Sequence, residues 1–229
     1  MDEIKISKVI NQPLAKRGMA ETMTAVWQSV PTFVQMANAR ADNLIKVKKA
    51  LEEQEITYND ILIKCMINAV KKTPEVNSTL DGDKWIIYED INVSVAVITE
   101  YGLFVPVIRN AGEKNINEIS ADVKAIVEKA KTGSLTLEDM SGGTITISNL
   151  GATGVETGTP ILNPPQAALA FIGNIRKVPV VDENDTIKAG YEIGYSVGYD
   201  HRFIDGMTGQ VFTTALKTEI EIVSQDSLY

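Results

Sequence analysis

A change of hydrophobic period between residues 194 and 206 constrains the fold more than any other stretch of this chain. Before Asp200, large residues alternate with small or polar ones, which is the period of a β-strand. These residues are Tyr195, Val197 and Tyr199. From Asp205 onward, apolar residues recur at three- and four-residue spacing, which predicts an amphipathic helix with Asp205 as its N-cap. His201, the only histidine of the chain, lies at this junction, where an imidazole can be held in one orientation.

Composition and charge exclude several classes of function. The 229 residues fit one sizeable domain or two small ones. The sequence has no apolar run long enough for a transmembrane helix and no signal-peptide core, so we expect no membrane association. A net charge of −8 without a basic block argues against nucleic acid as a partner. With one histidine and one cysteine, the sequence argues against a metal site. The single cysteine, Cys65, cannot form an internal disulfide, which suits a protein of the reducing cytoplasm. It lies on an apolar helix face, so we expect it to be buried and unreactive.

The apolar pattern predicts helices and strands in irregular order. Helical spacing covers residues 19–30, 41–53, 58–70, 117–131 and 205–223. Strand-like segments cover residues 32–39, 85–88, 91–98, 103–108, 144–148, 167–172, 178–181 and 187–199. No repeat or linker interrupts them, so we expect one domain over residues 1–229 of the α+β (mixed α/β) class. Hairpin signals predict that many strands are antiparallel.

Local signals refine this pattern. Thr57 followed three residues later by Asp60 approximates a capping box at the start of a helix with a broad apolar face. Residues 81–83 read Asp-Gly-Asp, a hairpin turn. Pro106 cannot donate a hydrogen bond to a neighbouring strand, so the strand at 103–108 should be an edge or a distorted one. In residues 144–148, two isoleucines should face one side and three hydroxyls, including that of Ser148, the other.

The segment Asp200-His201-Arg202-Phe203-Ile204-Asp205-Gly206 has a spacing found in a known family. It resembles the Asp-His-Arg-x-x-Asp-Gly motif of the dihydrolipoamide acyltransferase catalytic domain, the core component of 2-oxo acid dehydrogenase complexes such as pyruvate dehydrogenase. This family is related in fold to chloramphenicol acetyltransferase. Residues 102–109, 146–151 and 161–167 look like three more of the family's segments. The resemblance covers nearly the whole chain, from about residue 6 to about residue 221.

The resemblance implies an architecture and a set of partners. It implies a large mixed sheet packed by helices, in chains that form homotrimers. It leaves open whether the trimers assemble further into a cubic 24-mer or an icosahedral 60-mer core. It also implies coenzyme A as a substrate and a lipoyl group supplied by another domain or protein. Dehydrogenase components would be the other partners. The family builds its active site between subunits, with the histidine and the serine contributed from opposite sides of a trimer interface.

The reaction implied by the resemblance is acyl transfer between the thiols of dihydrolipoamide and coenzyme A. His201 would be the general base, because an imidazole with a pKa of about 6.5 can accept a proton from a thiol with a pKa of about 8.5. Ser148 aligns with the family's oxyanion-hole serine and would donate to the tetrahedral intermediate. Asp205 would be the third catalytic residue, because it would cap the last helix and fix either the histidine loop or the tautomer of the histidine. Arg202 would have a structural role and pair with a carboxylate to hold that loop.

Two departures from the family leave alternatives open. The family often has histidine after the proline that ends the first helix, where this chain has Thr32, which leaves the acyl or lipoyl preference open. The sequence also has no lipoyl domain, no peripheral subunit-binding domain and no Ala/Pro-rich linker, as expected of an excised catalytic domain or of a stand-alone relative. The alternatives are a same-fold acyltransferase with a different acceptor and a non-catalytic oligomeric scaffold.

Overall fold

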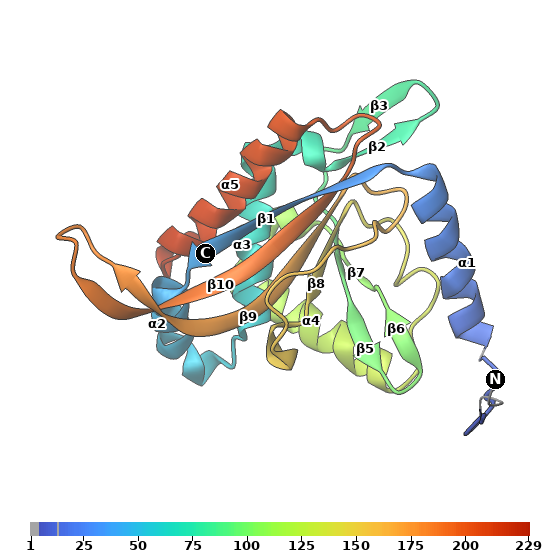
Figure 1. Ribbon diagram of the computed structural model, residues 1–229, viewed down its shortest axis with the longest axis horizontal. Helices are drawn as coiled ribbons and strands as arrows, with labels where there is room; N and C mark the ends of the chain where they lie inside the picture. Colours follow the sequence, from blue (N-terminus) through green and yellow to red (C-terminus); the bar gives the residue numbers. More distant parts are fainter. Residues whose placement is uncertain (1–4, 13) are drawn as a thin grey trace.

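The computed structural model describes residues 5–12 and 14–229 and shows helices packed on a mixed sheet (Figure 1). The α-helices are α1 (Leu14–Ser29), α2 (Asp42–Ala50), α3 (Tyr58–Lys72), α4 (Ile116–Lys131) and α5 (Gly206–Ile222). The strands are β1 (Thr32–Arg40), β2 (Ser78–Asp81), β3 (Lys84–Ile87), β4 (Val93–Val95), β5 (Val97–Thr99), β6 (Gly102–Phe104), β7 (Val107–Ile108), β8 (Ile145–Asn149), β9 (Ala168–Val181) and β10 (Ile187–Asp200).

The main sheet has six strands in the order β1-β10-β9-β8-β4-β7. β8 runs parallel to both β9 and β4, whereas the pairs β1–β10, β10–β9 and β4–β7 are antiparallel. The two smaller sheets are the hairpins β2–β3 and β5–β6. This architecture confirms the predicted class, a large mixed sheet packed by helices.

Three sequence predictions about strand limits are wrong. Residues 167–172 and 178–181 belong to one strand, β9, because β10 pairs with it along its length despite the polar residues between. The strand expected at residues 91–98 is instead divided into β4 and β5, and the one at 103–108 into β6 and β7. Pro106 explains the second break, since its carbonyl accepts from Val95 but it has no N–H to give, and β7 is the edge of the main sheet as predicted.

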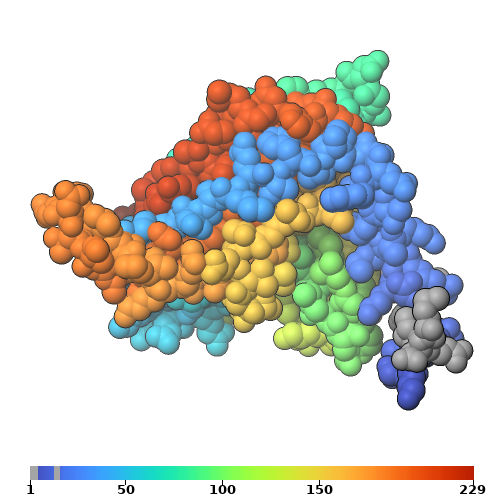
Figure 2. Space-filling model, viewed as in Figure 1, coloured from blue at the N-terminus to red at the C-terminus, as the bar shows by residue number. Residues whose placement is uncertain are grey.

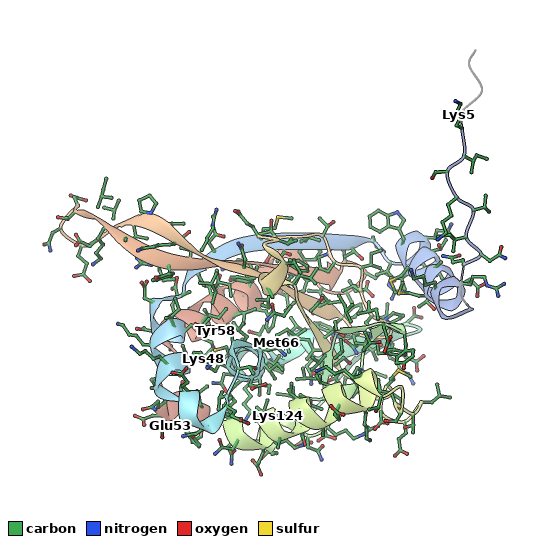
Figure 3. All side chains as sticks on the ribbon, turned by 90° about the horizontal axis from the view of Figure 1, so that it is seen from below. Lys5, Lys48, Glu53, Tyr58, Met66 and Lys124 are labelled. Atoms are coloured by element: carbon green, nitrogen blue, oxygen red, sulfur yellow. The ribbon has the colours of Figure 1, made fainter. Side chains whose placement is uncertain are left out.

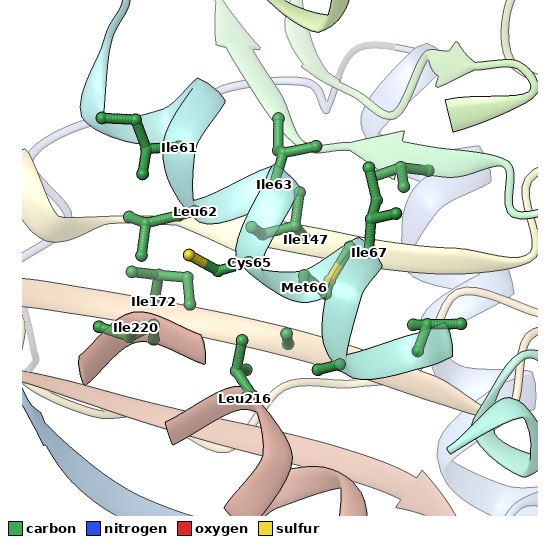
Figure 4. Close-up of a cluster of buried hydrophobic side chains, with 14 of the residues drawn as sticks. Ile61, Leu62, Ile63, Cys65, Met66, Ile67, Ile147, Ile172, Leu216 and Ile220 are labelled. Atoms are coloured by element: carbon green, nitrogen blue, oxygen red, sulfur yellow. The ribbon is translucent and has the colours of Figure 1, made fainter. Parts of the chain in front are cut away.

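The hydrophobic core lies between the sheet and helices α2 to α5, which cover one face of it (Figure 3). α3 is at its centre, and its N-terminus has the predicted capping box, in which Thr57 and Asp60 each accept a backbone N–H of the other. Cys65 lies among the aliphatic side chains of α3, α5, β8 and β9 (Figure 4). Burial raises the pKa of its thiol above the usual range, so this cysteine packs rather than reacts, as predicted.

α5 buries only part of its apolar surface. Phe212, Leu216 and Ile220 are fully buried against the sheet and α3. Met207 and Val211 remain 70% and 46% exposed. α1 behaves similarly, because Val26 is buried whereas Trp27 is 70% exposed. These exposed apolar side chains leave surface for a partner to cover.

The opposite face of the sheet is covered by the segment 150–166, seen in yellow across the middle of Figure 2. A small second core forms there, of Val26, Leu162, Leu169 and Phe171. The segment approaches the strands closely because glycines face it: a Cβ at Gly194 would lie 2.5 Å from the carbonyl oxygen of Glu156. A Cβ at Gly173 would overlap the same oxygen. At these two glycines, segment 150–166 contacts the backbone of β9 and β10 directly.

Candidate active site

His201 follows directly on the last residue of β10. Its backbone N–H donates to the carbonyl of Pro31 at 2.9 Å, which extends the antiparallel pairing of Thr32 with Asp200 by one residue. The imidazole is exposed and lies against Phe33, with ring centroids 4.4 Å apart and planes tilted by 45°. The backbone of His201 is thus fixed by β1 while its ring stays open to solvent.

The residues on either side of His201 form an ion pair. Arg202 donates through Nη2 to Oδ2 of Asp200 at 2.6 Å and through Nε to Oδ1 at 2.9 Å. The Asp200 side chain is 5% exposed, and its hydrogen bond with Arg202 raises the pKa of the guanidinium. The Arg202 backbone N–H donates to the same carboxylate, so the pair closes a tight loop around His201. The predicted role of Arg202, pairing with a carboxylate to hold the loop, is confirmed.

Asp205 caps α5 as predicted. Its Oδ1 accepts the backbone N–H of Thr208 at 2.7 Å, and this hydrogen bond is the main reason that the pKa of Asp205 is lowered. The Coulombic interaction with the nearby His201 adds a smaller lowering of the pKa of Asp205. Tyr199 Oη donates to the carbonyl of Gly209, so α5 is also anchored to β10 one turn further on. Strand end, loop and helix start are therefore held together.

Ser148 does not lie beside His201 within one chain. It is half-buried on β8 and pairs with Phe171 of β9, which in turn pairs with Ser196 of β10. Two strand spacings and five residues along β10 put the two Cα atoms on the order of 15–20 Å apart. The side chains also face opposite ways, because Ile147 points to the helix layer and Ser148 therefore points away from it.

Buried polar side chains also lie on the face of the sheet toward which Ser148 points. Gln166 accepts from Thr146 at 2.5 Å and donates to Ser94 at 2.9 Å. Ser196 donates to the carbonyl of Gly158 at 2.5 Å. Ile145 and Ile147 lie in the main core, whereas Thr146 and Ser148 of β8 face the other way, beside the small second core, as the predicted alternation requires.

Phe33 and Trp85 are neighbours of the site that sequence reasoning missed. Trp85 packs edge-on against Phe203 of the histidine loop, with ring centroids 5.9 Å apart. Both contacts depend on which strand lies beside β10 and where a hairpin folds, and neither follows from hydrophobic period. Thr32, the departure from the family's histidine, is half-buried and donates to the carbonyl of Val30.

Two cavities adjoin the site residues. One of about 410 Å³ lies between α1 and the loop that precedes β9, and Asp200 and Arg202 line it. The other, of about 490 Å³, is lined by Tyr58, Asn59 and Asn149, the residue after Ser148. Both have the size of small-molecule sites. Within residues 5–12 and 14–229, no group of three or more His, Cys, Asp or Glu side chains is placed to hold a metal ion.

Residues 6–226 match the family model described as 2-oxoacid dehydrogenases acyltransferase (catalytic domain). The chain belongs to this acyltransferase family. It is 34% identical over 209 residues to the dihydrolipoyllysine-residue acetyltransferase component of the pyruvate dehydrogenase complex of Rickettsia bellii, covering 88% of this chain and 50% of that protein. It is 33% identical over 217 residues to the lipoamide acyltransferase component of the branched-chain alpha-keto acid dehydrogenase complex of Bacillus subtilis, covering 92% and 51%. The chain spans about half the length of these relatives.

Solved structures of the acyltransferase family share the fold. A probable dihydrolipoamide acetyltransferase of Listeria monocytogenes superposes with a TM-score of 0.92 at 33% identity, covering 97% of this chain and 99% of that one. The cubic core of a pyruvate dehydrogenase multienzyme complex gives 0.89 at 29% identity, covering 95% and 92%. Chloramphenicol acetyltransferase is 13% identical and superposes with a TM-score of 0.54, covering 88% of this chain and 94% of that one, so it shares the fold alone.

The part of the chain that the structure describes has no helix both long and apolar enough to span a bilayer.

Proposed function

We propose that this chain transfers an acyl group between coenzyme A and the dihydrolipoyl group of another domain or protein. The observation that carries the proposal is the position of His201. The only imidazole of the chain is exposed at a strand end whose backbone is fixed by Pro31 and whose flanks are closed by an ion pair. The match of residues 6–226 to the acyltransferase family supports the same reaction.

The chemistry needs one base and one oxyanion donor. His201 removes the proton of the attacking thiol, and the resulting thiolate adds to the thioester carbonyl. When the tetrahedral intermediate collapses, the C–S bond to the leaving group breaks and the imidazolium returns its proton to the departing thiolate. Because one thioester is exchanged for another, the equilibrium constant of the reaction is close to one. Catalysis therefore has to lower the activation barrier only.

Ser148 would supply the oxyanion donor from a second copy of the chain. Its hydroxyl faces away from the helix layer, whereas His201 lies at a distant strand end, so one chain alone does not form the site. A homotrimer with an active site at each interface would bring the two together, and a cubic or icosahedral core would be built from such trimers. The solved core of a pyruvate dehydrogenase multienzyme complex that this chain resembles is cubic. One donor of this kind contributes roughly 10²–10³ in rate.

Asp205 contributes through structure. Its carboxylate caps α5, and this fixes the point at which the histidine loop ends. Residues 1–229 would act as one catalytic domain in the cytoplasm, with lipoyl-bearing and dehydrogenase components as separate partners. The relatives belong to both pyruvate and branched-chain complexes, so acetyl and branched acyl groups are the two candidate classes of acyl group.

The test is thioester exchange. Acetyl-CoA and a short series of branched and straight acyl-CoAs would each be incubated with free dihydrolipoamide and the protein, with His201→Ala beside the wild type. Turnover that falls at least about 10²-fold in the variant supports the proposal, and the best acyl-CoA names the substrate class. No turnover from a folded oligomer would favour a different acceptor or a scaffold without catalysis.

A further inference from the structure

We propose that Phe33 is a positioning residue for the imidazole of His201, so that β1 takes part in catalysis without touching a substrate. The inference rests on the function proposed above for His201. It concerns how the ring of that residue is held, which neither the family motif nor the sequence pattern addresses.

Three rings form a continuous stack at the end of β10. Tyr199 is fully buried, and its hydroxyl donates to the Gly209 carbonyl and lies 2.7 Å from Oγ1 of Thr213. Phe33 stacks on Tyr199 with centroids 5.1 Å apart and planes 27° apart. His201 packs on Phe33 at 4.4 Å. Phe33 therefore joins a rigid buried ring to an exposed catalytic one.

The strand register explains this stack. Phe33 is directly opposite Tyr199 in the antiparallel pair, and the backbone bond from His201 to Pro31 continues the same pairing. Phe33 and His201 are therefore diagonal neighbours on one face, a separation that aromatic side chains can bridge. Gly209 of α5 makes room for the stack, because a Cβ there would lie 3.0 Å from Cζ of Phe33.

No carboxylate takes over this role within the described residues. In serine-type triads an acid holds the base histidine in its orientation. Here Asp200 is paired with Arg202, and Asp205 caps α5 through Thr208. No hydrogen bond joins either carboxylate to the imidazole in residues 5–12 and 14–229. The ring contact with Phe33 is then what restricts the imidazole, and such a pair changes a conformer population by a factor of roughly 2 to 10.

The kinetic test compares two phenylalanines that contact the same tyrosine. Phe33 and Phe212 both pack against Tyr199, but only Phe33 also contacts His201. Phe33→Leu should lower kcat roughly 2- to 10-fold with KM changed less than about twofold. Phe212→Leu removes a fully buried ring and should cost at least as much stability while leaving kcat unchanged. Equal losses of kcat in the two variants would overturn the proposal.

A second readout follows the imidazole itself. His201 is the only histidine, so ¹³C-histidine labelling gives one imidazole signal without assignment. The Phe33 ring current should displace this signal from the position of free histidine. Phe33→Leu should move it back, Phe33→Met should do the same if the leucine variant folds poorly, and Phe212→Leu should leave it in place. An unmoved signal in the folded Phe33 variants would overturn the proposal.

The two readouts separate this proposal from the one on which it rests. His201→Ala in the same assay tests the base. If that variant keeps full turnover, the proposed function of His201 fails whatever the Phe33 signal shows. If His201→Ala is inactive and Phe33→Leu shifts the signal without changing kcat, the base is correct and the positioning role of Phe33 is wrong.

Discussion

Arg202 donates hydrogen bonds to both carboxylate oxygens of Asp200, and His201 is the residue between these two in the sequence. The acid is buried, whereas the guanidinium is 41% exposed. The ion pair between Asp200 and Arg202 therefore fixes the backbone on both sides of the proposed base, His201. The ring of His201 stays outside this cross-link, so its backbone and its side chain are held by different contacts.

The Asp200–Arg202 pair should stabilise the loop more than an ordinary surface ion pair does. Arg202→Ala leaves a buried carboxylate without its bidentate partner, and we expect the free energy of unfolding to fall by about 1–3 kcal/mol. Turnover should fall as well, because the loop carries His201. Arg176→Ala is the matched control: it breaks the exposed pair with Glu156 and should cost about 0–1 kcal/mol. Equal losses in urea titrations of the two variants would contradict this prediction.

The placement of Ser148 and His201 on different parts of the sheet predicts complementation between inactive chains. His201→Ala and Ser148→Ala should each lose turnover alone. When the two are unfolded together and refolded as an equal mixture, about a quarter of the interfaces in a cyclic homotrimer join an intact histidine to an intact serine. Thioester exchange should therefore return to about that fraction of wild type. A mixture that stays inactive, although mass spectrometry shows mixed oligomers, would place both residues in one chain.

Gly209 should be intolerant of a methyl group although it lies in a helix. A Cβ there would meet Phe33 at 3.0 Å and Tyr199 at 3.1 Å, and Tyr199 is held by its own hydrogen bonds. We expect Gly209→Ala to cost about 1–2 kcal/mol net, since overpacking exceeds the helix-propensity gain of about 1 kcal/mol. Gly18→Ala in α1 has nothing within 4 Å and should gain stability instead. Thermal unfolding of the two variants gives the sign of each change in stability. A rise in Tm for both variants would contradict this prediction and show that the rings of Phe33 and Tyr199 move to accommodate the methyl group.

Asp139 should make stability depend on pH in acid. Hydrogen bonds lower the pKa of its carboxyl to about 2, and the one from Lys129 contributes more than those from Thr136. The unfolded value is about 3.9, so this group stabilises the fold above pH 4 and the contribution is lost as the pH falls toward 2. The Tm of Asp139→Asn should be below that of wild type at pH 7, and the difference should shrink below about pH 4. A difference that stays constant from pH 7 to pH 3 would contradict this prediction.

Local patterns in the sequence predicted the helices and the histidine junction, although α1 begins at Leu14 and not at residue 19, and α2 ends at Ala50 and not at residue 53. The capping box at Thr57 and the N-cap at Asp205 depend on neighbours three residues away, so their spacing predicted them. The division of the strands around Pro106 depends on which strand accepts each N–H, which spacing does not contain. β9 likewise continues through a polar stretch because β10 lies beside it.

The site shows the same division between local and distant information. Asp200, His201, Arg202 and Asp205 are within six residues of one another, and a motif predicts them together. The contact of His201 with Phe33 joins positions far apart in the chain and follows only from the β1–β10 register. Ser148 was named by resemblance, and the structure adds that its hydroxyl faces away from the helix layer.

The glycines beneath segment 150–166 bear on how this chain can vary. Gly173 and Gly194 both face the carbonyl of Glu156, and Gly198 faces Pro160. The segment is therefore matched to the sheet at two fixed points four residues apart. Insertions or deletions between those points would slide it off its glycines. Changes of length between Gly151 and Glu156 would do the same, because Gly151 is also close to β9: a Cβ there would lie 2.6 Å from the carbonyl oxygen of Gly173. Changes of length anywhere within residues 151–160 of this chain should therefore be tolerated poorly.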